Sequence, residues 1–178
     1  QIALYLQQLT DTYADSLPHL VALPECFAVF GGRDGLQLQY QAPLGQGLIQ
    51  QGCAALAKQF GVYLLAGSLP TSSPEPQRFS ASSILFAPDG SIVADYQKMH
   101  LFDVAVSDNT GSYRESASTY PGQKITLAEV GGLKLGLTIC YDVRFAGLAQ
   151  ALAGKGMNLL TVPSAFTKVT GEAHWHTL

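Results

Sequence analysis

The sequence LKLGLTICYDVRFAGLAQAL, residues 133–152, predicts a strand that leads directly into a helix. Apolar residues at alternate positions share one face of the expected strand: Leu133, Leu135, Leu137 and Ile139. Past the strand, residues spaced i, i+3, i+4, i+7 form the apolar stripe of a buried helix face: Phe145, Leu148, Ala149 and Leu152.

Cys140 lies at the junction of this strand and helix, on the strand face opposite the leucines. A cysteine at such a point lies near unpaired backbone N–H groups and the positive end of the helix dipole, which favour thiolate over thiol. We therefore expect either a catalytic nucleophile or, since free cysteine is commonly buried, a small apolar core residue. This stretch alone leaves both interpretations open.

The remaining apolar patterns also alternate between helix and strand. They predict a helix from Ile2 to Tyr13, a second helix that ends at Gly61 with Cys53 in its buried face, and a last helix from near Thr170. Buried strands are expected at 20–23, 62–66 and 157–162, a hairpin around 88–90 and a surface loop at 71–77. We expect residues 1–178 to form part of a single α/β domain.

The segment 100–123 has little periodicity. Irregular segments of this length inside a compact domain are usually functional or disordered. We expect it to be a long loop.

Composition excludes several classes of partner. The 178 residues are 47% hydrophobic and 13% charged, which suits sheets that are covered on both faces. The net charge is −3 with no basic stretch, which argues against nucleic acid and against an anionic membrane surface. No apolar run is as long as a membrane-spanning helix.

The three cysteines, Cys26, Cys53 and Cys140, include no CxxC pair. This argues against a disulfide framework and a structural zinc site, and favours a reducing, cytoplasmic setting. Cys26 is expected to be inert, because it would point away from its neighbour Glu25 on an extended chain. His174 and His176 diverge at i, i+2 on a helix, so we expect no metal site there.

Polar side chains follow three of the expected strands at the points where they end. Glu25 follows the strand at 20–23, Lys98 follows the hairpin, and Cys140 follows its own strand. In open α/β sheets, sites gather beyond the carboxyl ends of strands, so one pocket could hold all three. Taken singly, Glu25 could be a solvated turn residue and Lys98 a surface charge.

With their flanks, these segments resemble the nitrilase, or carbon–nitrogen hydrolase, superfamily. The Leu-Pro-Glu at 23–25, the Tyr-Gln-Lys-Met-His-Leu-Phe-Asp at 96–103 and the Ile-Cys-Tyr-Asp-Val-Arg-Phe at 139–145 are similar to the family's glutamate, lysine and cysteine segments. The Arg-Glu-Ser at 114–116 resembles the loop with an additional active-site glutamate, here Glu115.

The resemblance implies a four-layer α-β-β-α sandwich, a homodimer when full length, and no metal or cofactor. The family also has a strand before Gln1 and a C-terminal part after Leu178, so we expect this chain to be a fragment that is incomplete at both ends.

The residue types then suggest how an amide is hydrolysed. Cys140 would attack the carbonyl and form a thioester, and Glu25 would take the thiol proton, protonate departing ammonia and activate water. Lys98 and the backbone N–H of Tyr141 would stabilise the oxyanion. Glu115 would hold Lys98 charged and oriented, or assist proton transfer.

Two further segments resemble the Nit branch, which contains deaminated glutathione amidases and ω-amidases: Pro-Ser-Ala-Phe at 163–166 and Thr-Gly-Glu-Ala-His-Trp at 170–175. Both groups act on small carboxylate-bearing amides. The first is favoured and the second is the alternative. A cationic group is therefore expected in the pocket, and Arg144 is the candidate, although a structural ion pair would also account for it.

Two rival interpretations remain. One is a non-catalytic binding protein on the same fold, against which the retention of Glu25, Lys98 and Cys140 argues. The other is a Cys–His hydrolase, for which His100 and His174 are the available histidines. His100 is otherwise expected to be a buried hydrogen-bonding residue, and Asp142 to cap the helix after Cys140.

Overall fold

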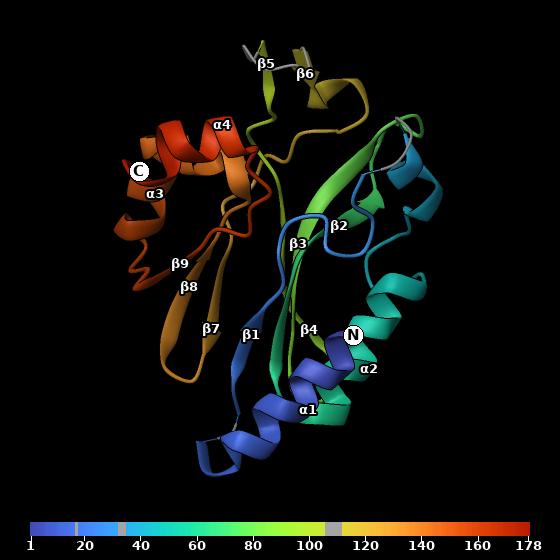
Figure 1. Ribbon diagram of the computed structural model, residues 1–178, viewed down its shortest axis with the longest axis vertical. Coiled ribbons are helices and arrows are strands. Elements are labelled where there is room, and N and C mark those ends of the chain that lie inside the picture. Colours follow the sequence, from blue (N-terminus) through green and yellow to red (C-terminus); the bar gives the residue numbers. More distant parts are fainter. Residues whose placement is uncertain (17, 32–34, 106–111) are drawn as a thin grey trace.

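The computed structural model describes residues 1–16, 18–31, 35–105 and 112–178, and its main feature is a pair of β-sheets that face each other (Figure 1). The first sheet has the order β1-β2-β3-β4, formed by Leu20–Ala22, Tyr63–Ser72, Phe79–Phe86 and Ile92–Gln97. The second has the order β7-β8-β9, formed by Leu127–Val130, Leu133–Leu137 and Leu159–Thr161. The pairs β1–β2 and β8–β9 are parallel, and the other pairs are antiparallel.

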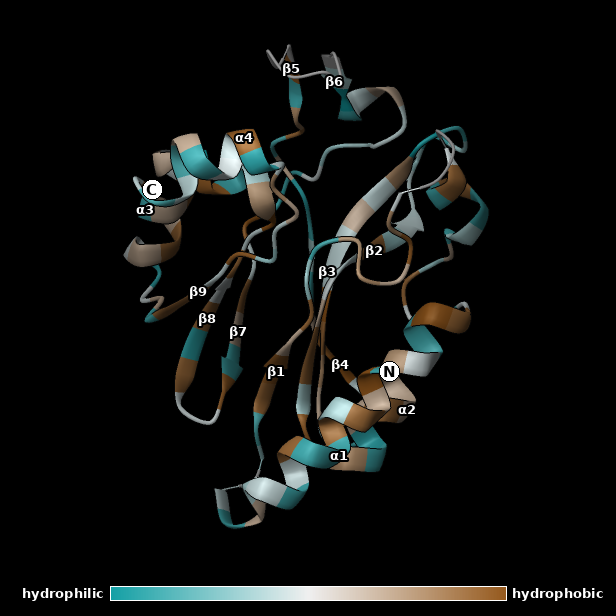
Figure 2. Cartoon of the chain, in the orientation of Figure 1, coloured by the Kyte–Doolittle hydropathy of each residue, from teal (hydrophilic) through white to brown (hydrophobic). Residues whose placement is uncertain are grey.

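Helices cover the outer faces of both sheets. The helices α1 (Ile2–Thr12) and α2 (Leu48–Phe60) lie beside the first sheet, and α3 (Ala146–Gly154) packs on β8 of the second (Figure 1). Apolar and polar residues alternate along α1 and α2, as they do on helices with one face against a sheet (Figure 2). The expected α-β-β-α layering, and with it the α/β class, is confirmed.

The short elements lie near the ends of these layers. A small sheet pairs β5 (Asp103–Ala105) with β6 (Ser112–Arg114), and α4 (Lys168–Thr170) continues into a π-helical turn, Gly171–Trp175. Single 3-10 turns occur at Ala14–Ser16, Leu36–Tyr40, Glu115–Ala117 and Cys140–Arg144. In the described part of the chain, no helix is long and apolar enough to cross a membrane.

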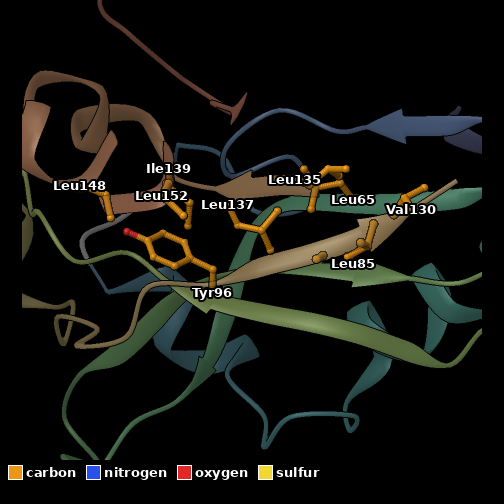
Figure 3. Packing of buried hydrophobic residues seen from close by; sticks show 10 residues of the cluster. Leu65, Leu85, Tyr96, Val130, Leu135, Leu137, Ile139, Leu148 and Leu152 are labelled. Atoms are coloured by element: carbon orange, nitrogen blue, oxygen red, sulfur yellow. The ribbon is translucent and has the colours of Figure 1, made fainter. Parts of the chain in front are cut away.

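The core is divided by the first sheet, because successive side chains of a strand point to opposite faces. Between the sheets, Leu65, Leu85 and Tyr96 meet Leu135 and Leu137, and α3 adds Leu148 and Leu152 (Figure 3). On the other face, α2 packs on β2 and β3 through a second cluster: Cys53, Ala57, Leu64, Ala66, Ile84 and Phe86. Cys53 is therefore a core residue, as expected.

The stretch at 133–152 differs from its prediction at the junction. The strand β8 ends at Leu137, and a 3-10 turn, Cys140–Arg144, separates it from α3. Cys140 has a φ of 46°, a left-handed conformation that reverses the chain. Phe145, expected in the core, is 36% exposed, and its ring stacks on His100 with centroids 3.6 Å apart.

Other predictions are confirmed or corrected by the strand order. The helix that ends at Gly61 and the hairpin at 88–90 are confirmed as α2 and the β3–β4 connection. The strands expected to be buried at 20–23 and 157–162 are β1 and β9, which lie at the edges of their sheets and are partly exposed.

Two expected loops contain strand residues. The loop at 71–77 begins later, since β2 extends to Ser72. The segment 100–123 contains β5 and β6, and its residues 106–111 lie outside the described part.

Candidate active site

The three polar residues that follow strands, Glu25, Lys98 and Cys140, line one cavity of about 400 Å³. Glu25 follows β1, Lys98 follows β4, and Cys140 follows β8 by three residues. All three line the cavity, together with Glu115 and Tyr141. The structure thus brings together five of the six site residues that the sequence suggests.

Lys98 is the centre of the charged cluster and is only 2% exposed. Its Nζ donates to Glu25 Oε1 at 3.0 Å and to Glu115 Oε1 and Oε2 at 3.0 and 2.9 Å. Burial by itself would lower the pKa of this ammonium, but the two carboxylates outweigh burial and raise the pKa above its ordinary value. Lys98 therefore stays charged inside the protein.

Backbone groups fix both carboxylates. Glu25 Oε2 accepts from the N–H of Ala165 at 2.8 Å, and Glu115 Oε2 accepts from the N–H of Phe102 at 2.6 Å. Each glutamate is therefore held from two sides, by Lys98 and by one peptide group. The sequence segment at 163–166 was recognised as a branch signature, but nothing in it signalled that Ala165 contacts Glu25.

A bulge in β2 supports the segment that carries Glu25. The register of β2 against β3 shifts between Ala66 and Leu69. Within this shift, Gly67 lies against the carbonyl groups of Leu23 and Pro24, and Ser68 Oγ accepts from the N–H of Cys26 at 2.8 Å. The bulge is a contact surface for the chain on either side of Glu25.

The turn that carries Cys140 is tied to the lysine segment through Asp142, whose side chain is fully buried. Its Oδ2 accepts from the N–H of Ile139 at 2.9 Å and from the Tyr96 hydroxyl at 2.7 Å. Its Oδ1 accepts from the N–H of His100 at 3.0 Å and lies 2.7 Å from His100 Nδ1. Asp142 caps the turn, as expected, and joins the segments on both sides of the cavity.

This arrangement also gives His100 a structural partner. Its ring lies on Phe145 and against Asp142, and the described residues that line the cavity do not include it. The geometry therefore offers no support for a Cys–His pair at Cys140.

The pKa of Cys140 is raised, which contradicts the expectation that the thiolate is favoured at this position. Burial, and then repulsion by the Glu25 carboxylate, raise the pKa of Cys140 to about 12, although Lys98 acts in the opposite direction. The short left-handed turn does not offset these effects. At neutral pH the resting side chain is a thiol, so attack on a substrate requires a base that removes its proton.

Cys26 lies in the cavity wall, which corrects its expected position. The prediction assumed an extended chain, whereas Cys26 has a φ of 55° and belongs to a tight turn. Gln37 Nε2 donates to its Sγ at 3.6 Å, and burial raises the pKa of this thiol.

Arg144, the sixth suggested residue, is not among the described residues that line the cavity. Its guanidinium lies over the rings of Tyr141 and Phe166, 5.3 and 5.9 Å from their centroids. Its Nε and Nη2 are buried and, within the described part of the chain, donate to no hydrogen-bond acceptor. It therefore lies behind an aromatic wall of the cavity.

That wall is the part of the site that the sequence did not signal. It comes from separate segments, and its members are Phe30, Phe102, Tyr113, Tyr141 and Phe166. The rings of Phe102 and Tyr141 meet edge to face with centroids 5.1 Å apart. Within the described residues, no group of three or more His, Cys, Asp or Glu side chains could hold a metal ion.

Fold and cavity together define an α-β-β-α protein with a partly buried thiol beside a carboxylate–lysine–carboxylate cluster. The chain belongs to the carbon–nitrogen hydrolase family, whose profile it matches over residues 9–178. The family recognised from the sequence is thus confirmed.

The chain is also similar to individual members of the family. The deaminated glutathione amidase of Yersinia enterocolitica is 47% identical over 133 residues, which cover 74% of this chain and 46% of the relative. Omega-amidase NIT2 of Homo sapiens is 36% identical over 160 residues, which cover 89% and 56%. The crystal structure of Saccharomyces cerevisiae Nit3, a member of branch 10 of the nitrilase superfamily, superposes with a TM-score of 0.82 at 31% identity, covering 99% of this chain and 61% of that one. The chain spans about half the length of the curated relatives it matches.

Proposed function

We propose that the protein hydrolyses small carboxylate-bearing amides through a thioester on Cys140. The observation that carries the proposal is the contact of Lys98 Nζ with both Glu25 and Glu115 in the cavity that Cys140 lines. An amide is a poor electrophile, so its hydrolysis needs a nucleophile, a base and a positive charge near the carbonyl oxygen. This cavity holds groups of all three kinds.

In the first half of the reaction, Glu25 takes the proton of Cys140 as the sulfur attacks the carbonyl carbon. The tetrahedral oxyanion is stabilised by Lys98 Nζ and by the N–H of Tyr141, at the first turn of a 3-10 segment where such groups have no intrahelical partner. The C–N bond then breaks, and Glu25 gives its proton to the leaving nitrogen. A thioester and a free amine result, which is ammonia for a primary amide.

In the second half, Glu25 removes a proton from water, which attacks the thioester. Collapse of the second tetrahedral intermediate releases the acid, and the proton returns to Cys140. Glu115 remains bonded to Lys98 throughout, so we assign it to holding the ammonium in position. No step requires a metal or cofactor.

For the substrate, we propose amides of the deaminated glutathione type, and ω-amides of α-keto acids as the alternative. The names of similar proteins support these two candidate substrate classes, since one is a deaminated glutathione amidase and another an omega-amidase. The two buried, unpartnered guanidinium nitrogens of Arg144, described above, support its assignment to a substrate carboxylate. Its position behind Tyr141 and Phe166 implies that this contact requires a shift of those rings.

The two substrates can be separated directly. We expect the full-length protein to hydrolyse deaminated glutathione with a higher kcat/KM than α-ketoglutaramate, measured by release of the peptide amine and of ammonia respectively. A higher value for α-ketoglutaramate would establish the alternative, and no hydrolysis of either would contradict both.

The assembly and location are part of the same proposal. We assign the full-length protein to the cytoplasm as a homodimer, on the resemblance to the Nit branch. The three cysteines of the described part are free, which agrees with a reducing compartment. Gel filtration of the full-length protein tests the dimer.

The base can be tested apart from the thiol with Glu25→Gln. Loss of the carboxylate removes a charge that disfavours the thiolate, so we expect the pKa of Cys140 to fall below about 12. The rate at which iodoacetamide alkylates Cys140 should then increase at a lower pH in this variant than in the wild type. Turnover should nevertheless fall by about 10²–10⁴-fold, because no group accepts the proton during attack.

The matched control is Glu129→Gln, at an exposed position on β7. This variant should leave both alkylation and turnover as they are. Retained turnover in Glu25→Gln would show that Glu25 is not the base.

A further inference from the structure

The charges of the cavity do not favour an anionic substrate. Lys98 shares its ammonium between Glu25 and Glu115 at distances of 2.9–3.0 Å. Two carboxylates and one ammonium leave this cluster with a net charge of −1. A substrate carboxylate that entered would be repelled unless another cation faced it.

Arg114 is a second cation in the cavity wall. It ends β6 and directly precedes Glu115, and its side chain is exposed rather than buried in the cluster. Within the described part of the chain, its guanidinium makes no ion pair and no hydrogen bond. A guanidinium in this state is available for a bidentate contact with a carboxylate.

The nearest internal competitor for this guanidinium is already engaged. Asp103 lies opposite Arg114 in the β5–β6 register. Its Oδ1 accepts from the N–H of Ser116 at 2.9 Å, and its Oδ2 accepts from the Ser116 hydroxyl at 2.6 Å. These bonds hold the Asp103 carboxylate on Ser116 and lower the pKa of Asp103, and the charge of Arg114 lowers that pKa further. Asp103 therefore attracts Arg114 electrostatically, but within the described part of the chain it forms no ion pair with the guanidinium.

Arg144 does not occupy the same place. It lies behind the rings of Tyr141 and Phe166, whereas Arg114 lies beside Tyr113 on the small β5–β6 sheet. Figure 1 shows that sheet standing beyond the ends of both large sheets, apart from α3 and α4. The two arginines therefore approach the cavity from different elements.

We propose that Arg114 binds a carboxylate of the amide substrate at the outer part of the cavity, away from the scissile bond, and so selects anionic over neutral amides. This assignment rests on the proposed function. It names a residue of the β5–β6 sheet as a determinant of substrate charge. An amide with a second carboxylate could engage Arg114 and Arg144 together.

Binding of glutarate to the full-length protein tests the proposal without any turnover. Calorimetry should show that Arg114→Gln weakens glutarate binding about tenfold, as expected for loss of one charge-assisted contact. Arg114→Lys should weaken it less, because it keeps the charge and loses the fork. The matched control is Lys124→Gln, an exposed cation outside this cavity, which should bind as the wild type does.

A second readout uses two amides that differ in charge. The ratio of kcat/KM for glutaramic acid to that for neutral glutaramide should fall about tenfold in Arg114→Gln, mainly through KM. An unchanged ratio, or glutarate binding equal to that of the wild type, would overturn the assignment. If no amide is hydrolysed, the proposed function fails, and the glutarate affinities still decide the role of Arg114.

Discussion

Replacement of Cys140 by alanine is expected to abolish amide hydrolysis and to leave the fold intact. Removal of a covalent nucleophile typically lowers kcat by at least about 10⁴-fold, because the remaining groups stabilise an attack that no longer occurs. Groups other than the sulfur hold the turn, since the N–H of Cys140 donates to Pro163 O at 2.9 Å and Asp142 caps the chain. Steady-state rates and thermal unfolding together measure the two effects.

The cavity provides its own control for this experiment. Cys26 is a second free thiol in the wall of the same cavity. Like Cys140, it has a left-handed backbone conformation and a thiol whose pKa is raised by burial. Cys26→Ala keeps the Ser68 contact of its backbone and should retain most of the activity. Turnover that survives in Cys140→Ala, or is lost only in Cys26→Ala, would transfer the nucleophile to the other thiol.

Gly67→Ala is expected to be strongly damaging, although it touches no charged group. A methyl group there would lie 2.0 Å from the carbonyl oxygen of Leu23 and 2.2 Å from that of Pro24. Backbone cannot yield as a side chain does, so the chain before Glu25 must move. We expect a loss of about 3 kcal/mol in the free energy of unfolding, at the upper end for overpacking, and a fall in kcat as Glu25 is displaced.

Gly52→Ala is the matched comparison. Gly52 is an exposed position inside α2, and its added methyl group would meet nothing within 4 Å. Alanine there should stabilise the protein by about 0.5–1 kcal/mol, because glycine is the weaker helix former. Denaturant unfolding and turnover distinguish the two variants, and equal stability of both would refute the contact at Gly67.

Local patterns predict several of the main elements and the order of the site residues along the chain. Periodicity located α2 and the β3–β4 hairpin, and the positions of Glu25, Lys98 and Cys140 at strand exits suggested a common cavity. The prediction that β1 and β9 are buried is wrong, because a short apolar run does not reveal how many neighbours a strand has. The position of a strand in its sheet is a tertiary property.

The remaining errors concern conformations and environments. Cys26 was placed away from the cavity because alternation assumes an extended chain, and a left-handed turn at a cysteine has no sequence signal. The pKa of Cys140 depends on its burial and on Glu25, which follows a strand of the other sheet. The aromatic wall and the three contacts of Asp142 with Tyr96 and His100 unite distant segments, so no local pattern could indicate them.

The contact between Glu25 and Ala165 spans 140 positions of sequence, and that between Glu25 and Lys98 spans 73. Contacts of such separation form late, because the cost of loop closure precedes their gain. Until the two sheets dock, Cys140 lacks the burial and the nearby Glu25 carboxylate that raise its pKa, so its thiol is more easily ionised than in the finished fold. Folding thus protects this sulfur from stray electrophiles, and the same docking step delivers the base that can deprotonate it.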